Sequence, residues 1–289
     1  MKWLEKCSIK LHLIWYENIT LFQKCLDKIF ICCCPYHNNL AFNLDCLMHT
    51  HDHSKNIIVQ SLSIHYGPTI ALNTIQGEIE PGSLTAVVGP NGGGKSTFVK
   101  TLAGILKPSS GKIVHQCRDT CDSAYLPQYT AVDHDFPVTV QEVISMGLWH
   151  KTGAFKGFSQ KDKDLIHQAI SQVGLEGMEN RLIKTLSGGQ FQRMLFARII
   201  LEDSSLIILD EPFTAIDVHT SEALIKLIKA WHTQGKTILL VLHDLQMAKK
   251  HFENTIILAR ECIAWGKTKE FLTDDNISLS YQNLLRGAE

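Results

Sequence analysis

The chain has 289 residues, of which 45% are hydrophobic and 20% are charged, and its formal net charge is −1. These values indicate a folded α/β protein of one or two domains, and they exclude a chain that binds nucleic acid through an overall basic surface. No run of 18 or more apolar residues occurs, so the sequence predicts no transmembrane helix. Contact with a membrane would therefore have to come through a partner.

Residues 1–47 differ from the rest of the chain in composition. They hold six of the nine cysteines and contain neither arginine nor glycine. They do not resemble a secretory signal, and Cys32-Cys33-Cys34 with His37 matches no structural zinc spacing. Two interpretations remain: an upstream reading frame before a true start at Met48, or an interfacial membrane segment. We favour the first, because the segment lacks the separate basic and apolar faces of an amphipathic anchor.

The predicted globular domain spans residues 48–289. It opens with three alternating histidines, His49, His51 and His53, which either bind zinc or manganese or belong to a solvated terminus. Residues from Ile57 to about Ser83 alternate as antiparallel strands do, with a turn at Gly82. An apolar strand over Leu84–Val88, a helix from Ser96 to Ala103 and a strand ending near Tyr125 should follow.

Residues from 129 to about 185 read as a mostly helical insert. Within it, one helix should begin after the N-cap residue Ser159 and end before Gly174. Its apolar residues fall on one face and predict subdomain core: Leu165, Ile166, Ala169, Ile170 and Val173. After Leu186 the α/β pattern returns, and the runs 206–209 and 237–242 read as strands buried on both faces of a parallel sheet.

A phosphate-binding loop connects the strand that ends at Val88 to the next helix. Its octapeptide fits the pattern G-x-x-x-x-G-K-[ST] and consists of Gly89, Pro90, Asn91, Gly92, Gly93, Gly94, Lys95 and Ser96, with Thr97 following. The glycines let backbone N–H groups surround phosphate oxygens, and the helix N-terminus adds a favourable dipole. We expect Lys95 to reach the β- and γ-phosphates and Ser96 to bind Mg²⁺.

Polar residues also follow two later strands. Asp210 and Glu211 come after Leu209, and His243 comes after Leu242. Because ligands of open α/β sheets bind beyond the carboxyl ends of the strands, one nucleotide should meet all of them. Asp210 would then hold Mg²⁺, Glu211 would deprotonate the attacking water, and His243 would contact the γ-phosphate.

A second anion-binding helix end is predicted at Leu186-Ser187-Gly188-Gly189-Gln190, directly before the helical run 191–198. Two such ends in one chain suggest a nucleotide held from both sides by two subunits. This segment, the phosphate loop, Gln128, the Asp-Glu-Pro motif and His243 together resemble the ATPase subunit of ATP-binding-cassette (ABC) transporters over residues 55–270.

The resemblance implies an ABC-type P-loop ATPase with a parallel-sheet core, an antiparallel β-subdomain and an inserted helical subdomain at about 129–186. It implies ATP and Mg²⁺ as ligands, bound in a head-to-tail dimer between the phosphate loop of one copy and Ser187-Gly188-Gly189-Gln190 of the other. Tyr66 would stack on adenine, Asp217 would link the two sites, and Gln128 would sense Mg²⁺. All residues needed for hydrolysis are present, so we expect an active enzyme.

The cargo is predicted from the segment Asp133-His134-Asp135-Phe136-Pro137, which resembles the V-D-W-D-F-P step of importer ATPases for manganese, zinc and ferrous iron. His134 departs from this pattern, which usually has Trp. Phe136 is either an apolar anchor for a permease or subdomain core. The implied partners are an integral membrane permease and, indirectly, an extracytoplasmic metal-binding protein, which would place the chain at the cytoplasmic face of a bacterial inner membrane.

Three rival functions stay open at this point. The first is an ATPase for an iron-siderophore or cobalamin importer. The second is an ABC protein of DNA repair or the ribosome, which the single cassette and the short helical insert disfavour. The third is a regulatory nucleotide-binding module, which Glu211 and His243 disfavour.

Overall fold

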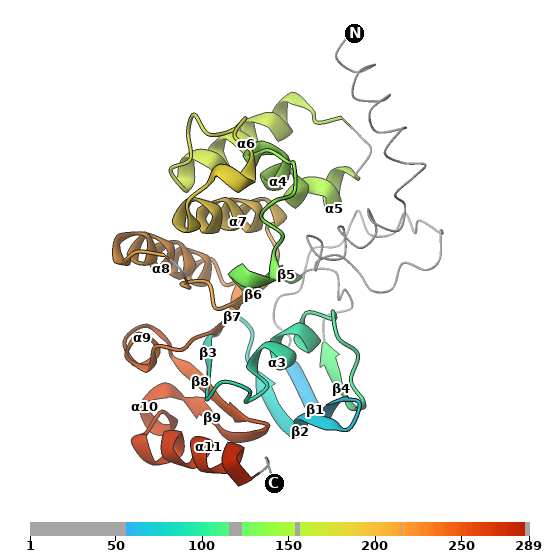
Figure 1. Cartoon of the computed structure of the whole chain (residues 1–289), viewed down its shortest axis with the longest axis vertical. Coiled ribbons are helices and arrows are strands. Elements are labelled where there is room, and N and C mark those ends of the chain that lie inside the picture. Colours follow the sequence, from blue (N-terminus) through green and yellow to red (C-terminus); the bar gives the residue numbers. More distant parts are fainter. Residues whose placement is uncertain (1–55, 116–122, 154–156, 215, 287–289) are drawn as a thin grey trace.

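The computed structural model describes residues 56–115, 123–153, 157–214 and 216–286 (Figure 1). The predictions for residues 1–47 and for His49, His51 and His53 lie outside the described residues.

The described strands form two sheets. The smaller sheet is antiparallel with the order β2-β1-β4 and consists of β1 (Ile57–Tyr66), β2 (Thr69–Ile79) and β4 (Ser110–His115). The turn between β1 and β2 lies at Gly67-Pro68 and was not predicted, and neither was β4. The predicted turn at Gly82 is present and leads into β3.

The larger sheet has six strands in the order β5-β6-β7-β3-β8-β9. They are β3 (Leu84–Val88), β5 (Ser123–Leu126), β6 (Leu206–Asp210), β7 (Thr237–Val241), β8 (Asn254–Ala259) and β9 (Glu261–Lys267). The first five in spatial order pair in parallel, and β9 pairs with β8 in antiparallel orientation. β6 and β7 are almost wholly buried, which confirms the prediction from their apolar runs.

Alternate residues of the larger sheet enter two different cores, as the period of two requires. On one face Ile208, Val241 and Leu258 join a core that contains Phe98 and Val99 of α3 (Lys95–Leu102) and residues of the smaller sheet. On the other face Leu209, Leu240 and Ile257 join a second core. That second core also contains residues of the helical insert and of α8 (Val218–Thr233).

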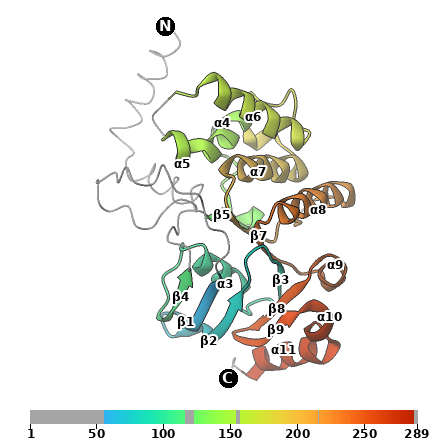
Figure 2. The same cartoon turned by 180° about the vertical axis from the view of Figure 1, so that it is seen from behind.

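The helical insert is confirmed. It contains η2 (Tyr129–Ala131), α4 (Val140–Ser145), η3 (Met146–Leu148), α5 (Trp149–Thr152), α6 (Gln160–Gln172) and η4 (Ile183–Thr185). These elements pack together with α7 (Gly188–Glu202) at one end of the molecule (Figure 2). The opposite end is formed by α9 (Leu245–His251), α10 (Thr268–Phe271) and α11 (Asp274–Arg286).

Helix α6 begins where the sequence predicts. Ser159 is its N-cap and forms a capping box with Asp162, and Gly174 follows the helix with φ of 66°. Ile166, Ala169, Ile170 and Val173 are buried in the second core. Leu165 was wrongly assigned to this face: the residue is 37% exposed, because it lies at the edge of the helix stripe that faces α4 and α7.

Candidate nucleotide site

The phosphate loop follows β3, which lies between β7 and β8. Gly89 adopts φ of 141°, and a Cβ atom there would lie 2.0 Å from the carbonyl oxygen of Leu258. Gly94 adopts φ of 87°, and a Cβ atom there would lie 2.4 Å from the Cδ2 atom of Leu72. At both positions only glycine fits this backbone, so the loop can wrap closely before α3 begins at Lys95.

Lys95 is held across this loop. The residue is only 5% exposed, and its Nζ atom donates hydrogen bonds to the carbonyl oxygens of Gly89 (2.9 Å) and Pro90 (3.0 Å). Burial lowers the pKa of the Lys95 ammonium group, and the nearby carboxylates of Glu211 and Asp210 oppose that shift. The Lys95 ammonium group is therefore held at the loop by two neutral carbonyl groups, which phosphate oxygens can replace.

Asp210 ends β6 and is 1% exposed. Its Oδ1 atom accepts a hydrogen bond from Ser96 Oγ at 3.0 Å, and its Oδ2 atom accepts one from the Tyr125 hydroxyl group at 3.1 Å. Burial raises the pKa of Asp210, and these two hydrogen bonds partly offset the effect. The contact with Ser96 brings together two residues predicted to bind the same metal ion. The contact with Tyr125 was not predicted.

Glu211 stands one residue further, in the left-handed region with φ of 52°. Its Oε2 atom accepts a hydrogen bond from Gln128 Nε2 at 2.7 Å, and its Oε1 atom lies 2.6 Å from His243 Nε2. The hydroxyl group of Thr214 also lies 3.5 Å from Oε2. A small pocket that includes Glu211, His243 and Thr214 opens beside the carboxylate. A positive φ at a non-glycine residue is strained, and such strain is concentrated at functional sites.

These contacts unite residues that follow three neighbouring strands. Gln128, Glu211 and His243 stand beyond the carboxyl ends of β5, β6 and β7, and the phosphate loop follows β3 next to β7. The structure places these polar residues together at one edge of the sheet, and that one nucleotide meets them all stays a prediction. Thr214 and Tyr125 are the additional site residues, and neither lies in a pattern that marks it from sequence.

The predicted second anion site forms the N-terminus of α7. Ser187 is the N-cap: its Oγ atom accepts a hydrogen bond from the N–H group of Gln190 (3.3 Å), whose Oε1 atom accepts one from the N–H group of Ser187 (3.0 Å). Asp217, the N-cap of α8, lies beside this end, since a Cβ atom on Gly189 would be 3.7 Å from its Oδ2 atom.

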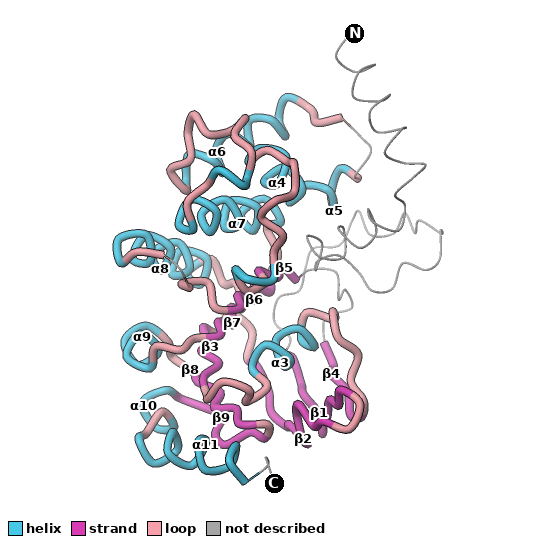
Figure 3. Tube along the Cα trace, in the orientation of Figure 1, coloured by secondary structure: helices cyan, strands magenta, loops and turns pink. Residues whose placement is uncertain are grey.

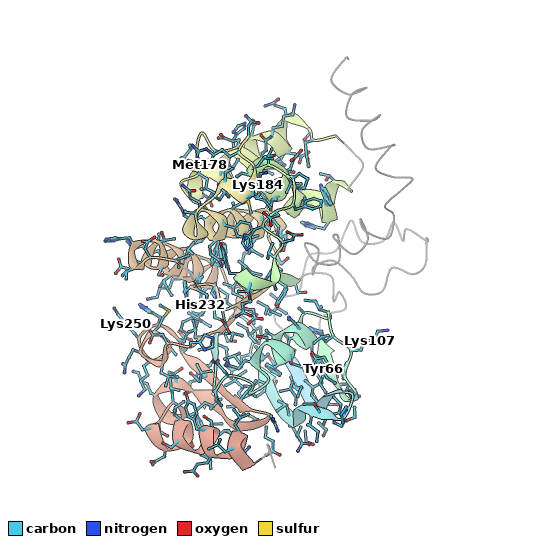
Figure 4. The ribbon with its side chains drawn as sticks, viewed as in Figure 1. Tyr66, Lys107, Met178, Lys184, His232 and Lys250 are labelled. Atoms are coloured by element: carbon cyan, nitrogen blue, oxygen red, sulfur yellow. The ribbon has the colours of Figure 1, made fainter. Side chains whose placement is uncertain are left out.

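The candidate residues thus lie in two parts of the molecule, one near α3 and one at the N-terminus of α7. In both ribbon views α7 lies beyond β5 and β6, whereas α3 lies with β3 and the smaller sheet (Figures 1 and 2). Tyr66 ends β1 and is 51% exposed. It lies in the part of the molecule that contains α3, whereas Lys184, just before the α7 N-terminus, lies in the helical part (Figure 4).

The segment 133–137 joins η2 to α4. The rings of His134, Tyr129 and Phe191 form a cluster in which the His134 ring contacts the other two, at centroid distances of 4.4 Å (Tyr129) and 4.1 Å (Phe191). Phe136 is partly buried against the second core, which favours its interpretation as subdomain core, and Asp133 is exposed. The His134 ring is therefore packed against the first turn of α7.

Comparison with known proteins identifies the family. The model of the ABC transporter family matches residues 72–214. The manganese transport system ATP-binding protein MntA of Synechocystis sp. is 37% identical over 236 residues, which are 79% of this chain and 91% of the relative. The zinc transport system ATP-binding protein TroB of Treponema pallidum is 35% identical over 77% of this chain and 85% of the relative.

The chain belongs to the ABC transporter family.

Two solved structures of ABC transporter proteins have the same fold. An inward-facing ABC transporter of metal-chelate type has a TM-score of 0.70 and 27% identity, covering 79% of this chain and 89% of that chain. A bacterial ABC transporter cassette solved as a dimer has a TM-score of 0.64 and 25% identity, covering 73% of this chain and 98% of that chain.

As a member of the ABC transporter family, the chain binds nucleotide and is an ATPase. This outcome confirms the function predicted from the phosphate loop and the residues around it. Among the described residues, no helix is both long enough and apolar enough to cross a membrane. Figure 3 shows helices α4 to α8 grouped in one part of the molecule, whereas most strands lie in the other part together with α3, α9, α10 and α11.

Proposed function

We propose that this chain is the ATP-hydrolysing subunit of an importer for divalent first-row metal ions, with manganese or zinc as the preferred cargo. The observation that carries the proposal is the similarity to ATP-binding proteins named for manganese and zinc transport, which extends over most of each relative. The segment 133–137 supports it, because it resembles the corresponding step of importers for manganese, zinc and ferrous iron.

The nucleotide phosphates are bound at the loop from Gly89 to Gly94, with Lys95 and Thr97 at the start of α3. Backbone N–H groups and the helix dipole favour an anion here. Lys95 exchanges its two carbonyl partners for phosphate oxygens when ATP enters. Because the ammonium group is already buried, ATP binding does not have to remove it from water. Tyr66, exposed at the end of β1, provides an aromatic face for adenine.

Mg²⁺ fits the group formed by Ser96, Asp210 and Gln128. The fit rests on oxygen donors, since Ser96 Oγ and Asp210 Oδ1 already lie 3.0 Å apart and Gln128 is bonded to the neighbouring Glu211. When bound, Mg²⁺ would neutralise charge that develops on the phosphate oxygens. The buried Asp210 carboxylate supplies the negative charge that such a cation needs.

Glu211 is the general base in this proposal. Its carboxylate is held by Gln128 on one oxygen and by His243 on the other, so its direction is set before substrate binds. It accepts a proton from the attacking water, while His243 orients that water and contacts the γ-phosphate. A base fixed in this way raises the rate by about 10²–10⁴-fold.

The ATP site is completed by a second copy of the chain, arranged head to tail. Ser187, Gly188, Gly189 and Gln190 of one copy face the phosphates bound by the other, and Asp217 beside Gly189 links the two sites. The separation of α3 and α7 within one chain supports this arrangement. Residues 48–289 form the ATPase domain, with its helical subdomain at about 129–186.

The partners are an integral membrane permease and, through it, an extracytoplasmic metal-binding protein. The chain would thus sit at the cytoplasmic face of the cell membrane, held by the permease. A second cargo class, a metal chelate, is favoured by one observation: the similar solved transporter is of metal-chelate type.

A deletion strain separates these cargoes. We expect it to lose cell-associated manganese or zinc and to recover growth when that ion is added, as measured by elemental analysis. The wild-type gene should restore metal content, and a gene that encodes Glu211→Gln should not. Normal metal content together with lost uptake of a siderophore or cobalamin would refute metal-ion import and support the chelate.

A further inference from the structure

Tyr125 is a tyrosine whose side chain is completely enclosed. It lies on β5, is 0% exposed, and belongs to the core that contains Phe98 and Val99 of α3. A buried hydroxyl group that lacks a hydrogen-bond partner is costly, and this one is bonded to a charged group: it donates to Asp210 Oδ2 at 3.1 Å.

The strand register brings the two residues together. β5 pairs in parallel with β6, and Tyr125 stands opposite Ile208. Asp210 lies two residues beyond Ile208 and therefore on the same face of the sheet. The long tyrosine side chain spans this offset. Phenylalanine would fill the same space but could not donate the hydrogen bond.

The backbone of Tyr125 is also held from the side of α7. Arg198 Nη2 donates to the carbonyl oxygen of Tyr125 at 2.9 Å. Arg198 Nε lies 3.1 Å from Glu202 Oε1, and both of these side chains are almost fully buried. A buried ion pair fixes the guanidinium group, which in turn holds the backbone of Tyr125 from which the side chain extends.

We propose that Tyr125 is a positioning residue of the ATPase reaction, because its hydroxyl group fixes the Asp210 carboxylate with Oδ1 directed at Ser96. The last torsion of an aspartate side chain is broad, so a carboxylate with one partner samples several orientations. Two partners, one on each oxygen, remove that freedom. The inference rests on the proposed role of Asp210 in holding Mg²⁺ beside Ser96.

The test is the Mg²⁺ dependence of ATP binding to the full chain with Tyr125→Phe, measured by equilibrium titration. We expect the Mg²⁺ concentration at half-maximal effect to rise about tenfold, as for the loss of one hydrogen bond to a charged group. Affinity for ATP in EDTA should stay within about twofold of wild type, because the phosphate loop is untouched. An ATPase titration with Mg²⁺ should show the same shift.

Thr255→Val is the matched control. Thr255 and Thr268 form a buried hydroxyl pair at 2.8 Å between β8 and α10, away from Asp210. This variant should lower the unfolding temperature and leave the Mg²⁺ dependence unchanged. If Tyr125→Phe does not fold, Arg198→Lys replaces it, and we expect a smaller shift in the same direction.

Asp210→Asn, measured in parallel, separates the role of Tyr125 from the role of Asp210. A large rise in the Mg²⁺ requirement for Asp210→Asn with no shift for Tyr125→Phe would overturn only the role of Tyr125. No change for Asp210→Asn would overturn the metal assignment and this inference with it. Equal loss of ATP affinity with and without Mg²⁺ in Tyr125→Phe would show a structural role alone and would also overturn the inference.

Discussion

The N-termini of α3 and α7 are both predicted to bind phosphate, yet they are built differently. α3 begins after Gly94, which has no side chain to cap the helix, and the loop before it folds back so that Lys95 contacts Gly89 and Pro90. α7 begins after Ser187, and its capping box with Gln190 already satisfies backbone N–H groups of the first turn.

This difference suggests a different role for each end in the proposed site. The α3 end has a cation, a hydroxyl group and a carboxylate beside it within one chain. The α7 end has a neutral cap and two glycines, and it can add contacts to a phosphate only if that phosphate is brought to it. Helix α6 has the same kind of capping box with no predicted ligand, so it serves as an internal reference.

The largest effect is expected for Glu211, the proposed general base. Glu211→Gln should lower kcat by about 10²-fold or more while ATP still binds, because the amide cannot accept the proton from water. Steady-state hydrolysis and a nucleotide-binding titration measure the two quantities. Glu253→Gln, an exposed carboxylate elsewhere, is the control. Near-normal turnover in Glu211→Gln would exclude this residue as the base.

The next effect concerns binding at the α3 cradle. Lys95→Ala should raise the Kd for ATP by about 10–100-fold, as expected when a hydrogen bond from a charged group is lost. Lys107→Ala removes an exposed lysine beyond α3 and should leave the Kd unchanged. Isothermal titration would compare the two variants. An unchanged ATP affinity in Lys95→Ala would contradict the phosphate-loop assignment.

A mixing experiment tests whether the two helix ends act across a dimer. Lys95→Ala and Gly188→Asp chains should each be inactive alone, the second because it places a negative charge where phosphate must approach. Mixed dimers carry both lesions in one composite site and neither in the other. We expect the mixture to recover part of the wild-type ATPase rate if one intact site suffices. Normal hydrolysis by either variant alone would refute the shared site.

The smallest effect is expected at the capping boxes of α7 and α6. Ser187→Ala and Ser159→Ala should each cost about 1 kcal/mol of unfolding free energy, the usual value for an N-cap hydroxyl group. Denaturant unfolding would measure both. Only Ser187→Ala should also lower the ATPase rate, since α6 has no predicted ligand. Equal ATPase rates in the two variants would show that the α7 cap is purely structural.

The sequence by itself was enough to predict most of the residues that form the candidate site. The phosphate loop, Asp210-Glu211 and Ser187-Gly188-Gly189-Gln190 are local patterns, because a glycine at a positive φ, a carboxylate after an apolar strand and a helix cap are each specified within a few residues. The capping of α6 by Ser159 and its end before Gly174 were predictable for the same reason.

Only the tertiary structure decided which partners those residues have. Tyr125 and Asp210 are 85 positions apart, and their contact depends on the parallel register of β5 and β6. Leu165 has the sequence neighbours of a core residue, but its place at the edge of the α6 stripe leaves it exposed. Pairing across strands and packing between helices depend on residues distant in sequence, and hydrophobic periodicity contains no information about which of them meet.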